Sequence, residues 1–305
     1  MSIKEPMQNV TNGYNNQYID LRSIISACFR AKWFIIAVTS LFAVSAVVIS
    51  INLPNVYQSK VLMAPSSNSD SAGMAGSLGG VASLAGINLA SNEIEQAALA
   101  VEIMRSFTFS KNFLQQDGVI ENLMAAKDWN KETNQVIYDP ALFNSEQKVW
   151  LEEDEVSLKP SLQKSHSELL KKLYIEQEKS GLYTLTIEHY SPHLAFEWAN
   201  YFVAQINLEM RKRDIAQAEK SINYLSEQLE TTKLEELRTS LHGLFEKQVR
   251  KKMLAEVNHE YVFRVIEPPI VAERKSKPSR ALICILATFI GFLLSIFIVV
   301  TRSFK

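Results

Sequence analysis

Two uncharged hydrophobic stretches, one near each end of the 305-residue chain, most constrain what it can fold into. The second stretch covers residues 281–301 and lies between Arg280 and Arg302. A helix rises about 1.5 Å per residue, so this stretch matches a hydrocarbon core about 30 Å thick. Backbone groups cannot stay unpaired in lipid, so an isolated run of this length must be helical. We therefore predict a transmembrane helix over residues 281–301.

The first hydrophobic stretch covers residues 33–53. A cleaved signal peptide is the competing interpretation, but its apolar region is about 7 to 15 residues long and ends in small residues. This stretch is longer and has no such exit, which favours an uncleaved membrane span. Arg22, Arg30 and Lys32 precede it, and the next basic residue is Lys60. The positive-inside rule therefore places residues 1–32 in the cytoplasm.

Two spans leave one large domain, residues 54–280, on the outer side of the membrane and return residues 302–305 to the cytoplasm. That domain is long enough for a hydrophobic core of its own. The chain has 32 basic and 33 acidic residues, a balance that argues against a nucleic-acid partner. The two cysteines, Cys28 and Cys284, lie outside the domain, which excludes a disulfide framework or a cysteine zinc site within it.

The outer domain opens with a predicted strand at residues 57–64, followed by a glycine-rich stretch. A phosphate-binding loop would need a lysine at the start of the following helix. No lysine occurs between Lys60 and Lys111, so we predict a flexible, close-packing loop. The role of residues 73–86 stays open. This stretch holds half of the chain's ten glycines, namely Gly73, Gly76, Gly79, Gly80 and Gly86.

Apolar periodicity and cap residues predict further elements along the domain. Residues 128–160 are mixed and carry an acidic run, residues 152–155, that lacks the ligand spacing of a calcium loop and is interpreted as a solvated surface. The predicted helices cover residues 93–107, 111–116 (with Ser110 as its cap) and 161–173, and the predicted strands cover 174–178, 182–189 and 261–267.

A helical arm is predicted over residues 192–257. Ser191 and Pro192 form a strong helix start, and the first half of the helix is apolar enough to pack on the sheet. Beyond it, apolar residues step by three and four, as in a coiled coil, and resume after a break at residues 231–233. This pattern favours an antiparallel hairpin, with one continuous helix as the alternative. The candidate seam consists of Ile215, Ala218, Ile222, Leu225, Leu229, Leu234, Leu237, Leu241 and Leu244.

No enzymatic site is expected. The sequence contains no nucleophile elbow, no H-E-x-x-H and no paired-cysteine motif, so we predict no catalytic residue, cofactor or metal. His189 and His193 lie on either side of a helix cap and therefore do not share a helix face. The two spans carry too few polar groups for a transport path, which leaves a scaffold as the simplest interpretation.

Small residues recur every fourth position in the second span, at Ala287, Gly291 and Ser295. Such spacing lets membrane helices approach closely. We predict that this face packs against the first span or against a neighbouring protomer.

The layout resembles the Wzz-type polysaccharide co-polymerases, the chain-length determinants of O-antigen. Residues 253–282 resemble the family's last helix, last strand and proline-rich approach to the second span, here with Pro268, Pro269 and Pro278. Residues 57–65 resemble its first strand. The resemblance implies an α+β fold in the bacterial inner membrane, with an α/β base, a long periplasmic arm and both termini cytoplasmic. It also implies a ring of identical copies that acts with a membrane polymerase on lipid-linked polysaccharide.

Three alternatives remain beside this interpretation. The adaptor half of a capsule-type tyrosine kinase would work with a separate kinase. A sensory receptor would need a cytoplasmic output domain, which we do not expect after residues 302–305. An export adaptor would link the inner membrane to an outer-membrane channel, but an arm of about 39 residues reaches only about 58 Å. The polysaccharide, its length and the ring size stay open.

Overall fold

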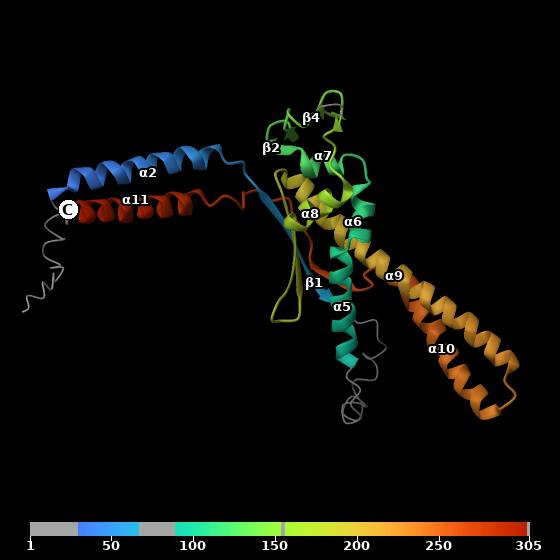
Figure 1. Cartoon of the computed structure of the whole chain (residues 1–305). Helices are drawn as coiled ribbons and strands as arrows, with labels where there is room; N and C mark the ends of the chain where they lie inside the picture. The colour runs from blue at the N-terminus through green and yellow to red at the C-terminus, as the bar shows by residue number, and fades with distance from the viewer. Residues whose placement is uncertain (1–29, 67–88, 154–155, 304–305) are drawn as a thin grey trace, which may run out of the picture. The chain divides into compact units, whose positions relative to one another are not determined.

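The structure is a computed structural model that describes residues 30–66, 89–153 and 156–303. It consists of two compact units (Figure 1): Met1–Leu53 with Ser279–Lys305, and Pro54–Pro278. The segment before residue 30, the glycine-rich residues 73–86 and part of the acidic run lie outside the described residues. The mixed helix and strand content agrees with the α+β class predicted from the sequence.

The first unit is a pair of packed helices, α2 (Lys32–Asn52) and α11 (Arg280–Ser303). Both are long and apolar enough to cross a membrane. Their outward side chains are mostly exposed, for example Trp33 and Phe297, as expected of helices that would face lipid.

The second unit is built on a four-stranded antiparallel sheet in the order β10-β1-β9-β8. Strand β1 (Tyr57–Pro65) pairs with β9 (Tyr183–His189) on one side and with β10 (Phe263–Glu267) on the other. Strand β8 (Leu173–Gln177) forms the opposite edge and joins β9 through a tight turn at Gly181, whose φ of 83° suits glycine.

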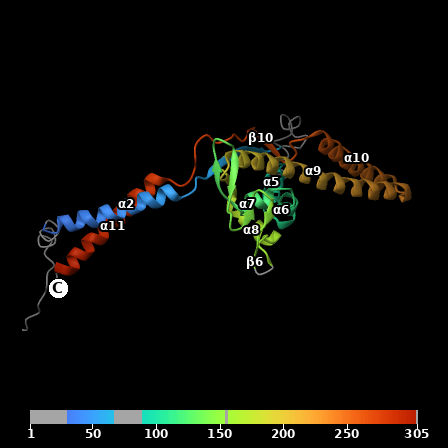
Figure 2. The ribbon, with the colours of Figure 1, turned by 90° about the horizontal axis from the view of Figure 1, so that it is seen from above.

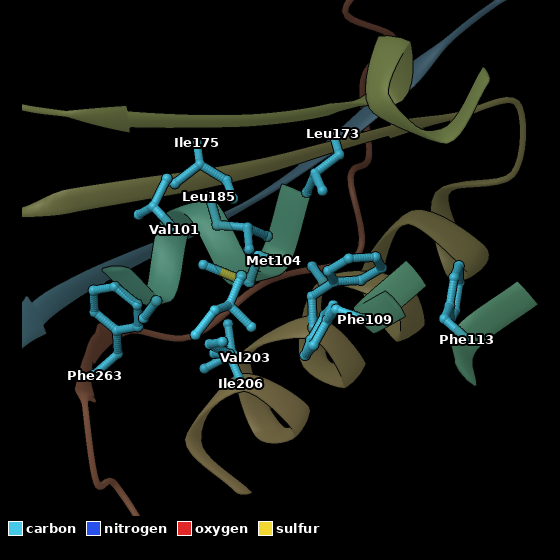
Figure 3. Close-up of a cluster of buried hydrophobic side chains, with 14 of the residues drawn as sticks. Val101, Met104, Phe109, Phe113, Leu173, Ile175, Leu185, Val203, Ile206 and Phe263 are labelled. Atoms are coloured by element: carbon cyan, nitrogen blue, oxygen red, sulfur yellow. The ribbon is translucent and has the colours of Figure 1, made fainter. Parts of the chain in front are cut away.

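Helices cover the inner face of the sheet and form one core with it (Figure 3). Met104 from α5 (Leu89–Arg105) and Ile206 from α9 (Pro192–Thr231) point toward the strand residue Leu185. Phe113 lies with Phe202 and Trp198 in an aromatic cluster, with ring centroids 5.0 and 5.2 Å from its own. Burial of each such side chain contributes about 1.5–3 kcal/mol. The remaining helices are α6 (Phe107–Leu114), α7 (Val119–Met124) and α8 (Leu162–Lys172).

The sequence prediction for α6 was wrong at its start. Ser106 is the cap, since its hydroxyl accepts a hydrogen bond from the Phe109 amide, and Ser110 is buried inside the helix. The earlier start brings Phe109 and Phe113, four residues apart, onto one buried face. The hydrophobic gain from both rings explains why the chain turns at residue 106.

The mixed segment folds as three small antiparallel hairpins. They are β2 (Ala126–Asn130) with β3 (Gln135–Tyr138), β4 (Phe143–Asn144) with β5 (Val149–Trp150), and β6 (Glu152–Glu153) with β7 (Val156–Ser157). The first hairpin is attached to the sheet through Trp129, whose ring meets that of Tyr57 edge-on at 5.5 Å.

The arm is an antiparallel helical hairpin, as the sequence favoured. Helix α9 runs for 40 residues and α10 (Glu235–Val257) returns beside it in both views (Figures 1 and 2). Ser191 caps α9 through the Leu194 amide, and Pro192 occupies its first turn. Ion pairs between Lys251 and Asp214 at 3.1 Å and between Lys252 and Glu219 at 2.9 Å connect the helices.

Candidate interaction surfaces

The small-residue face of α11 lies against α2. Gly291 and Ser295 are buried, and Ala287, one turn earlier, is half-buried. A Cβ atom added at Gly291 would lie 2.7 Å from the Cβ of Phe42, closer than real contacts allow. Gly291 is therefore the point where only glycine fits between the two helices.

We expect Gly291→Leu to destabilise the pair of membrane helices by about 1–3 kcal/mol, because even the first added carbon overlaps Phe42. Thermal unfolding of the full chain in detergent should show a lower midpoint. The matched control is Gly243→Leu in α10, where a Cβ would meet nothing within 4 Å. Equal midpoints for the two variants would show that the close approach does not matter.

The candidate arm seam is only partly enclosed within one copy. Ala218 and Leu225 are buried, and Ile215, Ile222, Leu229 and Leu241 are half-buried. The other three positions differ from the expectation, since they are exposed: Leu234 by 71%, Leu237 by 49% and Leu244 by 51%.

Two local features account for these exposed positions. Leu234 precedes the first turn of α10, so it cannot share the helical stripe. Further along, Phe245 and Val249 are half-buried and Ala255 is buried, which shifts the enclosed stripe away from Leu244. The larger Phe245 ring takes the place expected for Leu244.

Leu225 is the best position for a substitution that affects the arm alone, because its side chain is only 8% exposed and does not belong to the base core. Leu225→Asp should open the arm tip by leaving a carboxylate without solvent. Limited proteolysis should then cut first within residues 225–240 while the base stays intact. Leu237→Asp, on the exposed side, is the control and should leave the cleavage pattern unchanged. Simultaneous loss of the base would assign Leu225 to the base core.

The two edges of the sheet are closed by side chains of the same chain. At β10, the side chain of Asn207 accepts hydrogen bonds from the amides of Val262 and Phe263 at 2.8 and 2.9 Å and donates one to the Phe263 carbonyl at 2.9 Å. The next outward amide of β10, that of Val265, donates to a Glu260 carboxylate oxygen at 3.1 Å. Because free strand edges invite pairing with other chains, these contacts protect the β10 edge.

Strand β8 is protected in the same way. The Arg105 guanidinium at the end of α5 donates to the Ile175 carbonyl at 2.9 Å. The sequence analysis missed Arg105 and Asn207. The available signal was an asparagine at 207 between the apolar residues Ile206 and Leu208 of α9, since buried polar groups need partners.

The proline-rich segment ends β10 and leads back to the start of the unit. Pro268 and Pro269 lack the amide that a strand ladder needs, so pairing with β1 stops there. The chain then pairs with Val56, whose amide donates to the Lys277 carbonyl at 3.0 Å. The ammonium of Lys277 also lies 2.6 Å from a carboxylate oxygen of Glu188. Pro278 follows Lys277 through a cis peptide bond.

His189 and His193 are not brought together as a pair of ligands. His189 is 1% exposed; its Nδ1 accepts from the Ser191 amide and its Nε2 lies 2.9 Å from the Asn122 carbonyl. Burial, reinforced by the nearby Lys172 charge, lowers the pKa of His189 to about 4, so its ring is neutral at pH 7. His193 instead faces the Trp129 ring. Within the described residues, no cluster of three or more histidine, cysteine or acidic side chains could hold a metal.

A comparison with protein-family models bears on the N-terminal part of the chain. Residues 17–116 match the family model described as Wzz, chain length determinant protein. These residues are similar to the chain length determinant family. The match covers the first predicted span, β1 and α5, and it confirms the resemblance seen in the sequence. A search of curated proteins gave no significant match.

Two solved structures are similar to this chain, each at 12% sequence identity. One is a full-length bacterial polysaccharide co-polymerase. The structural match covers 93% of this chain and 96% of that protein, with a TM-score of 0.41. The other is a fragment of WzzB, a polysaccharide co-polymerase from Salmonella Typhimurium. The structural match covers 73% of this chain and 100% of that fragment, with a TM-score of 0.33. The similarity to the Wzz family rests on the match over residues 17–116.

Proposed function

We propose that this chain is a two-pass inner-membrane scaffold that sets the length of O-antigen or a related surface polysaccharide. It acts without catalysis, as a ring of identical copies beside a membrane polymerase that extends lipid-linked polysaccharide. The observation that carries the proposal is the Wzz chain length determinant match over residues 17–116. Two helices able to span a membrane, one on each side of a single α/β unit, support it.

The proposed topology places both termini in the cytoplasm and Pro54–Pro278 in the periplasm. In this arrangement the arm extends from the base, and the scaffold changes how long a polymer grows rather than whether it is made. A scaffold of this kind should alter the distribution of a product.

The test is a gel of surface polysaccharide from cells with and without the gene. Deletion should leave synthesis intact and replace a clustered length distribution with an unregulated one. A chain whose arm tip, residues 226–236, comes from another family member should move the cluster without abolishing it. Complementation with the unaltered gene is the control. Polymer trapped inside cells with a bare surface would refute length control and favour an export adaptor.

A further inference from the structure

A groove of about 430 Å³ follows the β10 edge of the sheet. On one side, α9 contributes Asn200, Ala204, Leu208 and Arg211, about one residue per helical turn. On the other side lie Val265 and the two adjacent prolines, with the fully buried Val61 among the lining residues.

The groove combines an apolar interior with a basic group at one end. The Arg211 guanidinium lies 3.3 Å from the His259 ring nitrogen Nδ1, and Arg211 is only half-buried. Glu260 also lines the groove, but its carboxylate already accepts a hydrogen bond from the Val265 amide. A fitting occupant would present an apolar side chain flanked by carboxylates.

Helix α5 of the same chain carries such a pattern on its exposed side. Leu99 is 54% exposed, and Glu95 and Glu102 are exposed four residues before and three residues after it. These spacings place the three residues on one helix face, which we call the Leu99 stripe. Arg105, at the end of the same helix, contacts β8, so α5 reaches the sheet edge opposite to the groove.

We propose that the groove of one copy receives the Leu99 stripe of a second copy. The proposal rests on the oligomer of the proposed function and names the surfaces that would form it. Leu99 fills the apolar interior, while Glu95 approaches Arg211, because Glu102 already pairs with Arg105 at 3.2 Å. From residue 200 to residue 211, α9 extends about 16 Å, and the stripe extends about 10 Å, so the groove is long enough.

Groove and stripe are different surfaces, one along β10 and α9 and the other on the exposed side of α5, so the contact is head-to-tail. Each copy keeps one free groove and one free stripe until the assembly closes, as in a ring. Strand addition is the other way in which copies of a sheet associate, but Arg105 and Glu260 already occupy the edges. The helix-in-groove contact leaves both of these caps in place.

The experiment uses two differently tagged full-length copies that are expressed together in cell membranes. Both copies lack the native cysteines (Cys28→Ser, Cys284→Ala). One copy carries Leu99→Cys and the other Leu208→Cys, and a short bis-maleimide is added. We expect a crosslinked dimer that carries both tags. Ile137→Cys, on β3 and 46% exposed, replaces Leu99→Cys as the matched control and should give no such dimer.

Two results would overturn the surface assignment. One is no mixed-tag dimer from the 99–208 pair, and the other is equal crosslinking by the control. Crosslinking of Leu99→Cys with itself, in place of the 99–208 pair, would show a two-fold contact instead. Arg211→Glu should abolish the mixed-tag dimer, and Glu95→Arg in the other copy should restore it. The polysaccharide gel of the gene deletion reports on length control separately, so a failed crosslink leaves that function standing.

Discussion

Replacing Asn207 by alanine should cost the Pro54–Pro278 unit about 3 kcal/mol or more of unfolding free energy. The side chain is 5% exposed and satisfies two amides and one carbonyl at the start of β10. Each buried backbone group left without a partner costs about 1–3 kcal/mol. Because the Ser66 amide donates to the Val262 carbonyl, the amide and carbonyl of Phe263 point to the open edge and have no strand to replace Asn207.

Urea unfolding of the full chain in detergent, followed by tryptophan fluorescence, measures this loss. Asn200→Ala is the control, because Asn200 lies two turns earlier on α9, is exposed and donates only to the Phe196 carbonyl of its own helix. It should be neutral or slightly stabilising, since alanine favours helix. If both variants unfold at the same urea concentration, Asn207 is not the link between α9 and β10.

Acidification should destabilise the Pro54–Pro278 unit through His189. In the unfolded chain its pKa is near 6.5, and in the folded chain burial lowers its pKa to about 4. Between these two pH values the His189 ring binds a proton in the unfolded state but not in the folded state. The folded state is therefore fully stable above pH 6.5 and loses stability as the pH falls toward 4. A difference of about 2.5 pKa units corresponds to about 3 kcal/mol.

The groups around His189 explain why its charge is not tolerated. The Lys172 ammonium donates to the neighbouring Leu123 carbonyl and repels a second cation, and the Trp198 ring lies 4.9 Å from the imidazole. Urea midpoints at pH 7 and pH 4.5 should differ less in His189→Gln than in the unaltered chain. His242→Gln, on the exposed side of α10, is the control and should keep the full pH dependence. A full pH dependence in His189→Gln would assign it to other groups.

Features with a local cause could be predicted from the sequence. The start of α9 follows from Ser191 and Pro192, and the β8–β9 hairpin follows from a glycine turn between alternating strands. The two apolar helices follow from length and composition alone. In each case the residues that determine the element lie within it.

Features that depend on distant partners could not be predicted. Asn207 has its role because Phe263, 56 residues later, begins the edge strand. The start of α6 depends on burial of Phe109 and Phe113 against α9, which outweighs the local cap signal of Ser110. Strands of two residues, such as β4 and β5, are too short to show any periodicity.

The pairing of Val56 with Lys277 makes the Pro54–Pro278 unit an insert whose two ends lie side by side. A unit that begins and ends at one point can be moved between hosts with only two junctions to match, as in natural domain insertion. This unit and the two apolar helices can then diverge at different rates within one gene. Recombination at residues 54 and 278 would exchange the entire Pro54–Pro278 unit while the two apolar helices stay the same.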